Sequence, residues 1–153
     1  MATEAPISKQ KKTILLIYIV ACLAFAAWCA YDGYYNQDWI AKHTNPDGSE
    51  KPYLVFNKHG PYYFVAGAIL LGIYLFAIRN RKIVAGETEL AISRKVKIPY
   101  DSIQKIDKTY FKSKGFFVLT YNDAGGREVN YKLNDRNYDN LQAVLDELVA
   151  KIS

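Results

Sequence analysis

The sequence predicts a membrane α-hairpin of two transmembrane helices joined to a small α+β domain, in which an antiparallel sheet or partial barrel carries one C-terminal helix. Three observations support this class. Residues 13–31 and 62–78 contain no charged side chain. From Ile83 onward, apolar and polar residues alternate with the period of a half-buried strand. Near the C-terminus, apolar residues instead recur at the three- and four-residue spacings of a helix.

The two charge-free runs predict transmembrane helices at residues 13–31 and 62–78. Runs of 19 and 17 residues approach the roughly 20 residues that cross a bilayer core. A basic start followed by an apolar run is also typical of a cleaved signal. Ala24-Phe25-Ala26 resembles a signal cleavage site, and Ile19-Val20-Ala21-Cys22 resembles a lipoprotein motif. Cleavage or lipidation at Cys22 therefore stays open, although the run continues well beyond the length that a signal needs.

Positive charge flanks the two runs on the same side. Lys9, Lys11 and Lys12 lie in the basic segment 1–12, and Arg79, Arg81 and Lys82 follow the second run. Because Lys- and Arg-rich segments stay in the cytoplasm, we expect a cytoplasmic (inner) membrane protein with both termini cytoplasmic. Residues 32–61 then form an extracytoplasmic loop, and residues 79–153 form a cytoplasmic domain.

The predicted extracytoplasmic loop has aromatic ends and polar turns. Asn45-Pro46-Asp47-Gly48 predicts a turn, and Pro52 and Pro61 are expected to break helical structure. His43 and His59 are expected to be solvated loop residues. Amphipathic rings concentrate at the lipid–water boundary. The expected interface anchors are Trp28, Tyr31, Trp39, Tyr62 and Tyr63.

Residues 79–153 predict four to six consecutive strands and one helix. Residues 88–92 and 96–98 alternate around the turn Ser93-Arg94-Lys95. Residues 116–121 and 127–133 flank a glycine-rich hairpin turn at 122–126. Asn134-Asp135 is expected to cap the final helix. Its apolar stripe, which we expect to lie on the sheet, comprises Tyr138, Leu141, Val144, Leu145, Leu148, Val149 and Ile152.

The chain offers no constellation typical of an enzyme. Residues 79–153 contain no His and no Cys, so we expect no catalytic residues, metal ligands, cofactor or small-molecule substrate. Cys22 and Cys29 lie seven residues apart on one predicted helix, or about 10 Å along its axis, too far for a disulfide within that helix. The net charge of +5 does not predict a nucleic-acid partner, because both signs are interleaved in the domain.

Six basic residues near the membrane exit are candidates for contact with membrane lipids. Each Lys or Arg close to an anionic leaflet contributes about 1 kcal/mol to surface binding. The same charges could instead be a topology-determining collar and a solvated turn. The candidates are Arg79, Arg81, Lys82, Arg94, Lys95 and Lys97.

Three features of residues 79–153 carry a resemblance to a known family. They are the segment Ile98-Pro99-Tyr100-Asp101-Ser102-Ile103-Gln104-Lys105-Ile106, the two strands across a glycine turn, and the C-terminal helix 138–152. Together they resemble bacterial membrane-anchored pleckstrin-homology-like (PH-like) domains. The resemblance implies about seven strands closed at one end by the helix, serving as a docking platform for proteins, peptides or lipids. Inositol-lipid recognition is not implied, because the helix lacks Trp and the turn 85–87 is not basic.

Together these features predict a membrane-anchored, non-catalytic interaction module whose PH-like domain binds protein at the cytoplasmic membrane surface, with lipid as a second candidate ligand. The alternative is a structural accessory subunit of a larger membrane complex, packed against partner helices.

Overall fold

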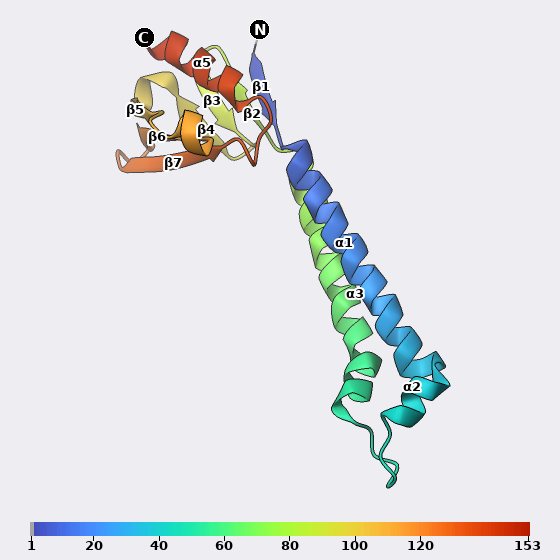
Figure 1. Cartoon of the computed structure of the whole chain (residues 1–153). Coiled ribbons are helices and arrows are strands. Elements are labelled where there is room, and N and C mark those ends of the chain that lie inside the picture. Colours follow the sequence, from blue (N-terminus) through green and yellow to red (C-terminus); the bar gives the residue numbers. More distant parts are fainter. Residues whose placement is uncertain (1) are drawn as a thin grey trace. The chain divides into compact units, whose positions relative to one another are not determined.

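A computed structural model describes residues 2–153 of the chain (Figure 1). The chain divides into two compact units, and each is described by itself. Residues Met1–Lys12 and Ile78–Ser153 form the first, here called the sheet unit. Residues Thr13–Ala77 form the second, the hairpin unit. The sheet unit is therefore assembled from both ends of the chain.

The sheet unit contains two antiparallel sheets. The first has the order β1-β2-β3-β4, from β1 (Thr3–Pro6), β2 (Lys82–Ala85), β3 (Glu89–Ile92) and β4 (Val96–Pro99). A single 3₁₀ turn, η2 (Tyr100–Ser102), leads to the second sheet. This sheet has the order β5-β6-β7, from β5 (Ile103–Asp107), β6 (Phe116–Asn122) and β7 (Glu128–Asn134). The alternating pattern from Ile83 onward thus forms six strands.

Strand β1 is the main departure from the sequence-based expectation, which treated residues 1–12 only as a basic cytoplasmic segment. Its register with β2 runs from Thr3↔Ala85 to Pro6↔Lys82. The side chains of β1 alternate between the core and the surface, as in other half-buried strands. Ala5 is fully buried in the core, whereas Glu4 lies on the surface and forms an ion pair with Lys82 at 2.6 Å. Residues 3–6 are therefore an integral strand of the sheet.

The outer edge of β1 is closed by the segment that precedes the final helix. The N–H of Asp139 donates to the carbonyl of Pro6 at 2.9 Å, and the Asn140 amide donates to the carbonyl of Glu4 at 3.1 Å. The N–H of Ser8 donates to the carbonyl of Asn137 at 2.9 Å. The backbone carbonyls of Glu4 and Pro6 on this edge are therefore hydrogen-bonded by residues of the same chain.

Helix α5 (Leu141–Ile152) lies against β1 and β2 (Figure 1). It begins later than expected, because β7 continues through Asn134 and residues 137–140 are occupied by their bonds to β1 and Ser8. Asn140, with φ 62°, is the residue before the helix, so Asn134-Asp135 is not its cap. The core of the unit comprises Ala5, Ile83, Ala85, Leu90, Ile92, Ile98, Ile103, Phe117, Leu119, Leu133, Leu141, Val144, Leu145 and Leu148.

The hairpin unit contains most of α1 (Lys9–Ala30), the π-helical turn η1 (Tyr31–Tyr35), α2 (Gln37–Lys42) and most of α3 (Pro52–Ile78). The expected loop at 32–61 is therefore largely helical. Pro52 is the first residue of α3, where its missing N–H would have no helical partner. Pro61 lies inside the helix and not at its start, so the expected break there is wrong.

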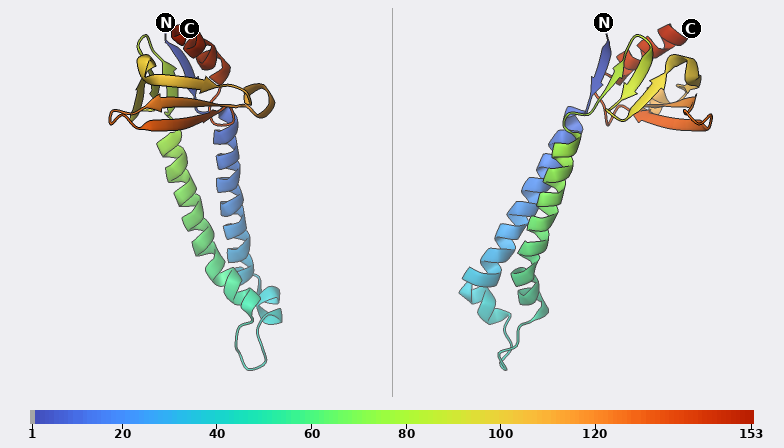
Figure 2. Two further views of the ribbon diagram at one scale, coloured as in Figure 1. Left: turned by 90° about the vertical axis from the view of Figure 1, so that its left-hand side faces the viewer. Right: turned by 180° about the vertical axis from the view of Figure 1, so that it is seen from behind.

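Helices α1 and α3 run alongside each other and come closest near α2, as the left view of Figure 2 shows. The rings of Phe25 and Phe64 are 5.1 Å apart. Near the end of α1 the backbones approach closely, since a Cβ on Gly33 would lie 2.8 Å from the carbonyl oxygen of Asn57. Pro61 has no N–H to bond this carbonyl, which lies four residues earlier in α3. The approach thus occurs where a proline interrupts the helical bonding.

Both long helices have the length and composition needed to cross a membrane. The candidate spans are Lys9–Tyr35 and Pro52–Ile78. Only 11% of the residues in the most apolar window of each are buried. In a soluble protein, most of the surface of a core helix is covered by the rest of the chain. Burial within this chain therefore does not explain the apolar composition of these two helices.

Candidate functional site

A groove runs along α5 in the sheet unit, between this helix and the chain from β5 to α4 (Phe111–Lys114). It consists of two adjoining hollows that share Lys108 and Val149. The hollow beside β5 measures about 260 Å³, and the one beside α4 about 540 Å³. We refer to both together as the β5–α5 groove.

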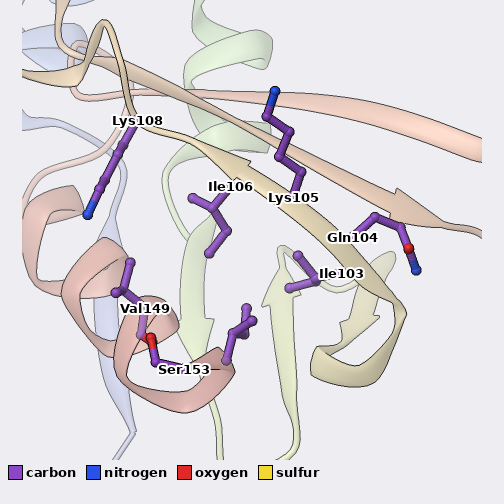
Figure 3. A pocket seen from close by; sticks show the side chains of 8 residues that line it. Ile103, Gln104, Lys105, Ile106, Lys108, Val149 and Ser153 are labelled. Carbon is purple, nitrogen blue, oxygen red and sulfur yellow. The ribbon is translucent and has the colours of Figure 1, made fainter.

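One wall of the groove is an edge strand. β5 pairs with β6 only, through a register that shifts between Ile103 and Lys105. The backbone groups on its other edge have no strand partner within residues 2–153. Figure 3 shows Ile103 and Ile106 extending from β5 toward α5, whereas Gln104 and Lys105 extend away from it. β5 therefore presents apolar side chains to the groove beside an open backbone edge.

The larger hollow has an apolar floor. Leu145 of α5 is 3% exposed, and Val149 lies one turn further along the same helix face. Phe111 forms the facing side, held by an edge-on contact with Phe117 at a ring separation of 5.6 Å. Gly115, with φ 72°, ends α4 in the left-handed conformation that favours glycine. These contacts fix Phe111 opposite the helix.

The apolar stripe of α5 is wider than the sheet can cover. Leu141, Val144, Leu145 and Leu148 are buried as expected. Val149 is only half-buried, Ile152 is 38% exposed, and both line the groove. The expectation that the whole stripe lies on the sheet is therefore wrong for its C-terminal edge, which forms part of the site.

Charged groups of opposite sign face each other across the groove. Lys108 and Lys112 line the β5–α4 wall, and Asp146 lines the α5 wall. Figure 3 shows the Lys108 side chain directed toward α5. The Asp146 carboxylate already accepts a hydrogen bond from the Gln142 amide at 2.7 Å. Hydrogen bonds from the Thr109 side chain and N–H, together with the charge of Lys105, lower the pKa of nearby Asp107.

The six basic residues proposed for lipid contact do not line the groove. Lys82 pairs with Glu4 at 2.6 Å, and Lys97 pairs with Glu89 at 2.8 Å. Arg94 and Lys95 are exposed in the β3–β4 turn. Arg79 and Arg81 lie in the connection between α3 and β2. The structure thus distributes these residues over the α3–β2 connection, β2, the β3–β4 turn and β4.

The expected aromatic anchors lie in the hairpin unit, mostly with exposed rings. Tyr31, Tyr62 and Tyr63 are exposed. Trp28 is exposed as well, and its indole N–H donates to the Asp32 carboxylate at 2.7 Å. Trp39 differs, because it is half-buried in α2 and stacks on His43 at a ring separation of 4.0 Å.

Of the two histidines expected in a solvated loop, only His59 lies in a helix. His43 is the turn residue directly after α2, where a ring nitrogen lies 2.9 Å from the carbonyl oxygen of Trp39. His59 is exposed within α3.

Sequence reasoning missed Phe111, Lys108, Lys112 and Asp146 as site residues. A lysine-rich, aromatic stretch at 105–116 was visible in the sequence, but only the fold places it opposite α5. Within residues 2–153, no three His, Cys, Asp or Glu side chains form a group that could hold a metal ion. Compared with protein-family models, curated proteins and solved structures, the chain matches none of them.

Proposed function

We propose that the chain is a membrane-anchored, non-catalytic interaction module: the hairpin unit spans the cytoplasmic membrane, and the sheet unit binds an extended segment of a partner protein in the β5–α5 groove. The observation that carries this proposal is the juxtaposition of an unpaired edge strand with an apolar hollow.

The geometry of the groove fits an extended polypeptide. An added strand would bond to the open edge of β5, as in strand-addition complexes, where the backbone supplies affinity and side-chain pockets supply specificity. The hollow of about 540 Å³ between Phe111, Leu145 and Val149 offers a place for a large apolar side chain. A flat, polar edge would offer only the first of these two interactions.

Pairing of β1 with β2 supports the proposed membrane topology. The two strands precede and follow the two candidate spans in the chain, yet they share one sheet. Both ends of the hairpin must then be on the same side of the membrane. The flanking Lys and Arg residues favour the cytoplasmic side. Cleavage at Cys22 would remove β1 from the sheet, so the proposal requires that the first helix be retained.

The arrangement also supports a PH-like architecture for the sheet unit. Antiparallel sheets of four and three strands precede a C-terminal helix, as that family implies. One feature departs from the expected order, because the hairpin lies between β1 and β2 and does not precede the whole domain. Lipid contact through the six basic residues has less support, since Lys82 and Lys97 are already engaged in ion pairs.

Site-specific photocrosslinking in native membranes tests the proposed function. A photoreactive residue replaces exposed Gln142 in the groove or, as a control, exposed Glu128 on β7. We expect a protein adduct from position 142 that is absent from position 128. Ala150→Arg, whose long side chain would occupy the apolar hollow, should abolish the adduct, whereas Ala124→Arg, which adds the same charge in the β6–β7 turn, should not.

Three results would contradict the proposal: adducts of equal yield from both positions, an adduct insensitive to Ala150→Arg, or lipid adducts alone. Near-UV circular dichroism of the purified variants establishes whether the sheet unit remains folded. A stoichiometric complex that survives detergent extraction but contacts only the hairpin unit would instead favour an accessory subunit.

A further inference from the structure

We infer that the segment bound by the β5–α5 groove is acidic and carries one large apolar side chain. This inference rests on the proposed function and specifies the chemistry of the partner. It follows from three properties of the groove: the charge of its walls, the absence of local partners for its lysines, and the apolar hollow between them.

The β5–α4 wall is strongly basic. Two of the four lysines between Gln104 and Gly115, Lys108 and Lys112, line the larger hollow, and this segment has a single carboxylate, that of Asp107. That carboxylate accepts a hydrogen bond from the N–H of Thr109 at 3.1 Å. Among the α5 side chains that line the groove, only that of Asp146 is charged. A bound segment would therefore meet a net positive groove.

The lysines at the hollow are available for a partner. Lys108 and Lys112 are exposed and form no ion pair within residues 2–153. Four other cations among the described residues of the sheet unit do form ion pairs, among them Lys151 with Glu147 at 3.6 Å. Carboxylates of a bound segment could pair with Lys108 and Lys112, an attraction that is weaker at high salt because exposed charges are screened.

The apolar hollow distinguishes a protein segment from a simple anion. Phe111, Leu145, Val149 and Ala150 line the space between the lysines and the helix. An inorganic phosphate or a lipid headgroup would satisfy the lysines and leave this surface exposed to water. An extended segment whose alternate side chains point to one face can place an apolar residue in the hollow and acidic residues beside it.

The test uses ten-residue peptides with a central Leu or Phe and flanking positions filled with Glu, Gln or Lys. Binding to the full chain in nanodiscs of neutral lipid is measured by fluorescence anisotropy. We expect the Glu series to bind at least tenfold more tightly than the Gln series, and the Lys series to bind least. Replacement of the central residue by Ser should weaken binding tenfold or more.

Charge reversal provides the matched comparison. Lys108→Glu with Lys112→Glu should invert the preference so that the Lys series binds best. Arg94→Glu with Lys95→Glu makes the same change of charge in the exposed β3–β4 turn and should leave the preference unaltered. Both pairs of residues are exposed, so neither double variant should unfold the sheet unit.

The outcomes separate this inference from the proposed function. Stronger binding of the Gln or Lys series that is still lost in Ala150→Arg would overturn the acidic preference while retaining the groove as the docking site. Failure of every series to bind would overturn the inference that the partner segment is acidic. Photocrosslinking from position 142 would still test, independently, whether the groove is the docking site. If Lys108 and Lys112 affected only binding of anionic vesicles or inorganic phosphate, the lysines would serve an anion and not a protein segment.

Discussion

Asp139 caps the first helix of the chain, because its carboxylate oxygen Oδ2 accepts a hydrogen bond at 2.9 Å from the backbone N–H of Lys9, 130 residues earlier. The N–H groups in the first turn of a helix have no helical acceptor, and a carboxylate there also interacts favourably with the helix dipole. The same residue bonds Pro6 of β1 through its own N–H. One residue near the C-terminus thus holds both a strand and a helix start near the N-terminus.

Replacement of Asp139 should destabilise the sheet unit. Loss of a capping side chain costs about 0.5–2 kcal/mol, so Asp139→Ala should lower the melting temperature, and Asp139→Asn, which keeps an acceptor, should lower it less. Differential scanning fluorimetry of the detergent-solubilised chain measures both changes. Asp101→Ala, at an exposed carboxylate in η2, is the control. Equal effects of Asp139→Ala and Asp101→Ala would refute a capping role.

Excision of the hairpin should leave a folded sheet unit only if β1 is kept. We expect residues 79–153 alone to be unstable, because removal of β1 exposes the apolar surface that Ala5 and Ile7 cover. A chain in which residues 2–8 are joined to residues 80–153 by a short Gly-Ser linker should fold, since Pro6 already pairs with Lys82. The dispersion of amide-proton signals in NMR spectra compares the two polypeptides, and similar spectra would show that β1 is dispensable.

Gly33→Ala should disturb the packing of the hairpin unit. An added Cβ would lie 2.8 Å from the carbonyl oxygen of Asn57, and backbone on both sides would have to move. Gly67→Ala is the matched control, because nothing lies within 4 Å of a Cβ at that position. In thermal unfolding in detergent micelles, the first variant should be less stable than the native chain and the second should not. Indistinguishable melting temperatures would contradict the close approach.

Tyr100 should make the sheet unit sensitive to alkaline pH. Its hydroxyl donates to the carbonyl of Gly86 at 2.8 Å. Burial, followed by the charges of Glu147 and Glu89, raises the pKa of this phenol above its ordinary value. The protonated form is therefore favoured by folding. Its contribution is complete below about pH 10, the ordinary tyrosine value, and is lost as the pH rises through the higher pKa of the folded state.

Tyr100→Phe tests this dependence. At pH 7 the variant should be less stable by about 0.5–1.5 kcal/mol, the usual contribution of one hydrogen bond. The difference from the native chain should shrink above pH 10, because the native chain loses its advantage as Tyr100 ionises. Urea titrations at pH 7 and pH 11 measure it, with Tyr110→Phe, at a 47% exposed position, as the control. A difference independent of pH would contradict the assignment to Tyr100.

Features that depend only on neighbouring residues could be predicted from the sequence. Two charge-free runs predicted two long apolar helices, and the alternation around Ser93-Arg94-Lys95 predicted β3 and β4. The turn between β6 and β7 followed from Asp123 and its glycines, and Asp123 indeed accepts from the N–H of Gly125 at 2.9 Å. Each depends on a local rule, namely the period of apolar residues or the conformational freedom of glycine, so no knowledge of distant partners was needed.

Tertiary structure decided what depends on residues far apart in the chain. The four residues of β1 carry too short a pattern to predict a strand, and their partner β2 follows only after the hairpin, with Glu4 and Lys82 78 positions apart. The candidate site has the same origin. Val149 and Ile152 read as core residues from their spacing, but the sheet covers only part of the α5 stripe, and β5 leaves its edge open beside the remainder. Spacing along a helix specifies which residues share a face, while the extent of the surface packed against that face determines which of them are buried.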